Sequence, residues 1–157
     1  MKYKYFLIAI SIVLAEMPVI AQKKPIARKT TVVKYKIPKM STLLGTYKDS
    51  VALPVAEVLT ILGQPLKIID VNQQVYSITN MQFLYRKRVV SETEDGKAIP
   101  AVSVVSQSFK STPLPETWLS SIREQLKKGE ELYFFDIIVK DTKGHILYAP
   151  NLKISIL

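Results

Sequence analysis

Apolar and polar residues alternate along the first of two long β-prone segments in the middle of the chain. Within residues 75–90, apolar side chains fall at Tyr76 and Ile78 and, after a change of phase at Asn80, at Met81, Phe83 and Tyr85. This two-residue period predicts a β-strand with one buried face, and the phase change predicts a bulge. Residues 99–109 return as a partner strand after a turn at 94–97, whose Asp-Gly pair favours a tight hairpin. We therefore expect the two segments to form a long β-hairpin.

Shorter β-prone segments flank this hairpin. Residues 66–71 form one of them, and residues 131–140 are apolar on both faces, as in a central strand. The last two segments, 145–149 and 152–156, are separated by a Pro-Asn break. Residues 51–61 are rich in Val, Leu and Ile and are also expected to be extended. Together these patterns predict a mainly β, sandwich-like fold.

One segment after the hairpin has a helical period instead. Its apolar residues share one face and its polar residues the other. Pro113 and Glu116 suit the first turn of a helix, and Gly129 suits its end. The pattern predicts one α-helix packed on the core, with docking into a partner's groove as the alternative. The apolar stripe consists of Trp118, Leu119, Ile122 and Leu126.

The first residues of the chain predict export. Lys2 and Lys4 precede an apolar run over residues 5–15, and small or aliphatic side chains, Val19 and Ala21, occupy the −3 and −1 positions of a possible cut. This order is typical of a secretory signal peptide cleaved near Ala21. An uncleaved anchor is the alternative, although a membrane span needs about 20 apolar residues. We expect residues 1–21 to be removed and the protein to be periplasmic or secreted.

Most of the net charge of +9 lies in the next segment. Residues 22–40 contain seven basic and no acidic side chains, whereas residues 41–157 contain thirteen basic and twelve acidic ones. We expect residues 22–45 to form a basic flexible tail or linker and residues 46–157 to form a single β-rich domain. Because a nucleic-acid-binding domain carries a basic face on the fold itself, no nucleic-acid partner is expected.

Basic side chains are the residues expected to contact a partner. The tail could meet an acidic protein, the cell wall or a lipid surface by charge. On the fold, one basic triplet in the first strand of the hairpin should point its charges to both faces. The candidate contacts are Lys23, Lys24, Arg28 and Lys29 in the tail and Arg86, Lys87 and Arg88 on the fold.

The side chains offer little for catalysis. The chain has no cysteine, which excludes thiol nucleophiles and cysteine-bound zinc, and it has no glycine-rich phosphate loop. Its one histidine, His145, follows a turn. Asp136 interrupts an apolar strand and is expected to cap a backbone group or pair with a lysine. We predict no catalytic, metal or cofactor site, with a small hydrolase using Asp136 or His145 as the alternative.

The C-terminal half resembles a known family. Residues 119–144 pass from a helix through Lys127-Lys128-Gly129-Glu130 into an apolar strand and a Gly-containing hairpin, and the chain closes on Pro150 and an alternating strand. This order resembles the C-terminal domain of the gliding-motility protein GldM and its secretion counterpart PorM. Residues 76–84 are similar to the family's first long strand. The resemblance covers residues 66–157.

The resemblance implies a periplasmic β-rich domain with one helix and no catalytic residue. In that family the domain is the tip of a periplasmic rod that docks on an outer-membrane-associated ring in type IX secretion. Here the domain follows a signal peptide and a short tail, so we expect a separate, non-enzymatic protein-interaction domain in the cell envelope. The alternative is a surface or fimbrial module that pairs by strand addition. The sequence leaves the partner's identity and the oligomeric state open.

Overall fold

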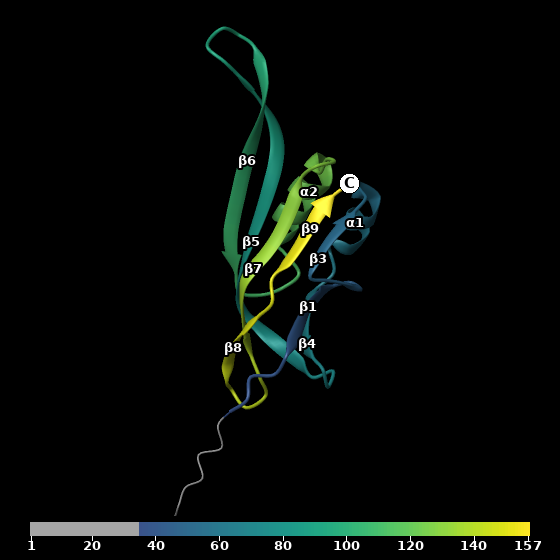
Figure 1. Cartoon of the computed structure of the whole chain (residues 1–157), viewed down its shortest axis with the longest axis vertical. Helices are drawn as coiled ribbons and strands as arrows, with labels where there is room; N and C mark the ends of the chain where they lie inside the picture. Colours follow the sequence, from purple (N-terminus) through teal and green to yellow (C-terminus); the bar gives the residue numbers. More distant parts are fainter. Residues whose placement is uncertain (1–34) are drawn as a thin grey trace, which may run out of the picture. The chain divides into compact units, whose positions relative to one another are not determined.

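β-strands make up most of the structure (Figure 1). The computed structural model describes residues 35–157, which contain nine strands and two helices. The predicted mainly β fold, with a helix after a long hairpin, is confirmed. The predicted signal peptide and tail residues 22–34 lie outside the described residues. In chain order the elements are β1 (Met40–Leu44), β2 (Tyr47–Lys48), β3 (Ser50–Leu53), α1 (Val55–Ile61), β4 (Leu66–Asp70), β5 (Val75–Glu92), β6 (Ala98–Phe109), α2 (Glu116–Gln125), β7 (Glu131–Lys140), β8 (Ile146–Ala149) and β9 (Leu152–Ile156).

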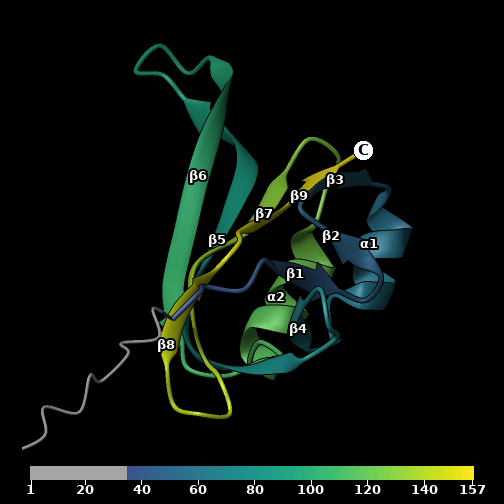
Figure 2. The ribbon, with the colours of Figure 1, turned by 60° about the horizontal axis from the view of Figure 1, so that its bottom comes forward.

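The strands join in one strongly curled sheet. Its main path runs β2-β1-β4-β5-β7-β9-β3, with β6 paired to β5 and β8 paired to β7. All of these pairs are antiparallel except β3 with β9. The buried Thr42 hydroxyl of β1 donates to the Pro150 carbonyl between β8 and β9. This contact brings β1 to the connection between β8 and β9, so that the sheet curls around the core (Figure 2).

β5 and β6 form the long hairpin predicted from the two β-prone segments and the Asp-Gly turn between them. Their register runs without a shift from the pair Met81–Phe109 to the pair Glu92–Ala98. The bulge predicted at Asn80 is also confirmed, because the register between β5 and β7 shifts on both sides of this residue. The β7 residues opposite the shift include Asp136, whose φ of 47° lies in the left-handed region.

Helix α2 covers the buried face of β5, as its apolar stripe predicted. Leu119 and Ile122 are buried. Trp118 packs edge-on against Phe83 of β5 and Phe109 of β6, with ring centroids 5.5 Å and 5.6 Å away. Helix α1 and alternate residues of β4, β7 and β9 complete the same core.

Residues 55–61 form a helix and not the extended segment predicted from their composition. Pro54 fixes the backbone just before the first turn, and its carbonyl accepts the N–H groups of Glu57 and Val58. Val58, Ile61 and Leu62 are buried three and four positions apart, which is a helical spacing. In this segment packing against the sheet outweighs the β-propensity of valine and isoleucine.

Two predicted boundaries differ from the observed ones. β1 lies within the predicted tail of residues 22–45, so the folded unit begins earlier than expected; all five β1 residues pair with β4. Helix α2 ends at Gln125, before the expected stop at Gly129, because Leu126 already has an extended ψ of 125°. The N–H of Lys127 then donates to the Glu130 side chain and not to a helix carbonyl.

Candidate protein-interaction surface

The end of the β5–β6 hairpin projects past the other elements of the described fold (Figures 1 and 2). β7 pairs with β5 only as far as Arg86, whereas β6 stays paired with β5 to Glu92. Beyond Arg86 the hairpin therefore has no third strand beside it within residues 35–157. We call residues 86–104 the arm.

Both faces of the arm expose apolar side chains. Val90, Val102 and Val104 share one face and are 73%, 51% and 55% exposed, respectively. Val89 and Ile99 are exposed on the other face. Natural proteins usually protect edge strands with charge or proline, and clustered exposed apolar residues mark contact surfaces. The arm is thus the strongest candidate for an interaction surface on the described residues.

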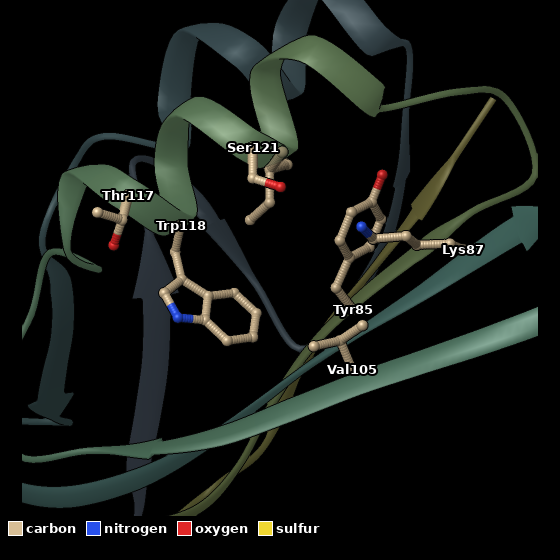
Figure 3. Close-up of a pocket in the computed structure, with 7 residues that line it drawn as sticks. Tyr85, Lys87, Val105, Thr117, Trp118 and Ser121 are labelled. Carbon is tan, nitrogen blue, oxygen red and sulfur yellow. The ribbon is translucent and has the colours of Figure 1, made fainter.

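A groove of about 210 Å³ lies between α2 and the base of the arm (Figure 3). Trp118 and Ser121 of α2 line one side, and Tyr85, Lys87 and Val105 of the hairpin line the other. The Trp118 indole N–H donates to the Gln107 amide oxygen at 3.0 Å, which fixes the ring against β6. The groove can therefore accept an apolar side chain next to a lysine.

The basic triplet lies at the base of the arm, and alternation points its charges to both faces, as predicted. Arg86 pairs with Glu131 at 3.3 Å. The Lys87 ammonium contacts the neutral Gln125 amide oxygen at 2.7 Å and lies 5.0 Å from the Tyr85 ring centre. Arg88 lies over Gly129, where a Cβ would fall 2.3 Å from its guanidinium carbon. The tail candidates Lys23, Lys24, Arg28 and Lys29 lie outside the described residues.

A buried carboxylate anchors the arm to the rest of the fold. Glu130 is 2% exposed and accepts three hydrogen bonds: from the Tyr85 hydroxyl and from the backbone N–H groups of Arg88 and Lys127, the last two at 3.0 Å. Burial, together with the bond to Glu130, raises the pKa of Tyr85 far above its ordinary value, so its hydroxyl stays a donor. Sequence analysis missed this role. The signal for it is an acid directly after a glycine at a strand start.

A second polar cluster surrounds the turn between β7 and β8. Asp141 accepts the N–H groups of Lys143 and His145 at 2.8 Å and the His145 ring Nδ1 at 2.6 Å. The Tyr35 ring packs on the His145 ring at 4.3 Å. Burial opposes ionisation of Asp141, but the bonds from His145 and Lys143 outweigh it and lower its pKa to about 2. The cluster closes the turn with groups of the chain itself.

We expect the Asp141→Asn variant to lose stability in a pH-dependent way. The folded pKa lies below the ordinary value of 3.8, so ionised Asp141 stabilises the fold above that pH. This contribution disappears as the pH falls from 3.8 to about 2. In urea titrations the gap between the wild-type and variant midpoints should therefore be full near neutral pH and should close in this acid range. Asp95→Asn at the exposed hairpin tip is the control, and an equal gap for both variants would contradict the assignment.

Asp136 and His145, the two residues considered for hydrolysis, do not bond to each other. The ring partner of His145 is Asp141, not Asp136. Asp136 is exposed at the bulge, and its carboxylate has no hydrogen bond or ion pair with any residue of 35–157, so the predicted capping or lysine pairing is not observed. The acidic residues Glu92, Glu94 and Asp95 are all exposed at the hairpin tip.

The chain matches no protein-family model, and no curated protein matches it. Within residues 35–157, no three side chains of His, Cys, Asp or Glu gather as a metal site would need. Neither of the two helices in that part of the chain has the length and apolar character required to cross a bilayer.

Proposed function

We propose that this chain is an exported, non-enzymatic protein-interaction domain of the cell envelope that binds its partner through the arm. The observation that carries the proposal is a projecting hairpin with an unpaired edge strand and three valines more than half exposed. The resemblance of residues 66–157 to the rod-tip domain of GldM and PorM supports the same role. On this proposal the signal peptide directs the domain to the periplasm or beyond.

Charge at the base of the arm supports an acidic partner. Lys87 and Arg88 take part in none of the ion pairs found within residues 35–157. The lysine-rich tail would add long-range attraction to the same kind of surface, and binding should then weaken as salt rises.

Position-specific crosslinking in intact cells tests the proposal. Because the chain has no cysteine, a single one can be introduced at Val104 on the arm or at Val71 in the turn after β4. Both valines are exposed, 55% and 71%, so the pair is matched. A photoreactive thiol reagent that cannot cross the inner membrane should label both variants if the protein is exported. We expect a protein adduct from Val104→Cys and none from Val71→Cys.

Three outcomes would overturn the proposal. Absence of label at both positions would contradict export. Adducts of equal yield at both positions, or none at either, would show that the arm is not the contact surface.

A surface or fimbrial module is the second candidate, because β6 has an unpaired edge that could take a strand from another copy. Strand donation from copy to copy builds polymers. Size-exclusion chromatography of the purified mature chain would show a ladder or a void peak for this candidate and a discrete low-mass peak for the first.

A further inference from the structure

Resting on the proposed function, we infer how the partner binds: it adds an extended strand to the free edge of β6 between Ala101 and Gln107. One apolar side chain of that strand enters the groove beside Trp118. An acidic side chain two residues away pairs with Lys87. The partner is therefore an extended segment of another protein with an apolar residue and an acid spaced two apart.

Two observations show which residues of β6 point their backbone N–H and C=O groups to the free edge. The backbone N–H of Arg88 donates to Glu130, which lies on the β7 side of β5. The backbone N–H and C=O of Arg88 therefore point away from β6. Arg88 is opposite Val102, and in an antiparallel ladder two opposite residues either bond each other or both point outward. Val102 therefore directs its N–H and C=O to the free edge. Because the register has no shift, Val104 and Ser106 do the same.

Pro100 agrees with this assignment and limits the usable edge. It has the same parity as Val102, and a proline is tolerated in a ladder where its nitrogen faces away from the neighbouring strand. Because Pro100 has no N–H to donate, the edge near the arm tip pairs poorly with another strand. From Ala101 to Gln107 no such interruption occurs.

The groove lies on the side of the sheet to which alternate side chains of a strand added at this edge would point. Residues of odd number on β6 lie on the face that packs toward α2, since Phe109 is buried there and Val105 lines the groove. A partner residue opposite Val105 would point to the same face, one strand spacing of about 4.8 Å further out. Its side chain would meet Thr117 and Trp118 of α2, which line the groove.

The positive charge of Lys87 favours an acidic side chain at the partner position opposite Ser103. Lys87 is opposite Ser103, and its ammonium has only the Gln125 amide oxygen and the Tyr85 ring as polar contacts within residues 35–157. A partner residue opposite Ser103 lies two strand spacings from Lys87, about 10 Å between Cβ atoms, which a lysine and a glutamate together can span. β6 itself contains no acidic residue. Pairing of β6 with β6 of a second copy would leave Lys87 unmatched, so the occupant is a different protein.

Three synthetic peptides test the inference on the purified mature chain. The first, Thr-Val-Leu-Val-Glu-Val-Thr, places leucine opposite Val105 and glutamate opposite Ser103 in an antiparallel pairing. The second exchanges leucine and glutamate to suit a parallel pairing, and the third replaces glutamate of the first by lysine. We expect one of the glutamate peptides to bind about fivefold tighter than the lysine peptide. The Lys87→Glu variant should reverse that preference.

Amide hydrogen exchange distinguishes strand addition from other contacts. Peptide binding should protect the N–H groups of Val102, Val104 and Ser106, while Ser103 and Val105, already bonded to β5, should change little. Val104→Pro should weaken peptide binding at least about tenfold because it removes the central donor. Val104→Ala, which keeps that donor, is its matched control. Since the Val104 N–H faces away from β5, Val104→Pro should melt within a few degrees of Val104→Ala.

The outcomes separate this inference from the proposed function. No binding of any peptide at about 1 mM, or protection spread over odd and even residues alike, would overturn strand addition. If Val104→Cys still gives its adduct in cells in that case, the arm binds its partner in another way and the proposed function stands. Absence of that adduct together with protection of the even-numbered residues by peptide would show that the edge of β6 pairs with a strand in solution but would contradict the proposed function.

Discussion

Replacing Glu130 by alanine is expected to destabilise the fold by about 3–5 kcal/mol. The carboxylate is buried and accepts three donors, from Tyr85, Arg88 and Lys127. Alanine leaves all three without an acceptor, and each unsatisfied buried donor costs about 1–3 kcal/mol, part of which water entering the space would offset. Urea unfolding followed by far-UV circular dichroism measures the loss.

Two further variants make this prediction specific. Glu130→Gln keeps the shape and one acceptor oxygen, so we expect a smaller loss of about 1–3 kcal/mol. Glu131→Ala at the next position removes a partly exposed ion-pair partner of Arg86 and Lys153 and should cost less than about 1 kcal/mol. A Glu130→Ala variant as stable as Glu131→Ala would refute the anchoring role of the buried carboxylate.

Replacing Phe83 by alanine is expected to cost about 3–5 kcal/mol as well, for a different reason. Phe83 is fully buried, and its ring lies 5.5 Å from Trp118 and 4.9 Å from Phe134. The substitution leaves a cavity between β5, β7 and α2, and the close-packed side chains around it cannot move enough to fill it. Because Trp118 is the one tryptophan of the chain, its fluorescence should report the loosened contact as well as the lower midpoint.

Val90→Ala is the control for this core substitution. Val90 lies in the same strand but is 73% exposed on the arm, so its loss should change the free energy of unfolding by less than about 0.5 kcal/mol. Equal losses of stability for the two variants would mean that Val90 is packed in solution as tightly as Phe83. The division of β5 into a buried part and an exposed part would then be wrong. The contrast also separates the role of β5 in the core from its role in the arm.

Periodicity predicted much of the fold because it records local geometry. The alternation that begins at Tyr76, the β-prone residues 99–109 and the Asp-Gly turn between the two segments give the hairpin, and the phase change at Asn80 gives the bulge. The stripe beginning at Trp118 gives α2 and its packing. Short segments carry less of this signal, and α1 was predicted as extended because seven residues rich in valine and isoleucine suit both states.

The candidate site was predicted only in part. The basic triplet and its division between two faces follow from strand alternation, but its neighbours do not. That Arg86 is paired, that Lys87 faces a groove and that Arg88 covers Gly129 all depend on α2, β7 and the loop between them, and the residues contacted lie 38 to 45 positions later in the chain. No local pattern reports contacts between such distant residues.

The sequence by itself determined that the two long segments of the hairpin are extended, where the hairpin turns and which face of the one predicted helix is buried, because these properties repeat with the geometry of the local backbone. Only the tertiary structure decided that the hairpin outruns its neighbours, that the edge of β6 stays unpaired beyond Pro100 and that Glu130 is buried beneath the arm. Those features depend on where β7 and α2 end relative to β5. Strand lengths and pairing partners are set by long-range packing and not by the pattern of any one segment.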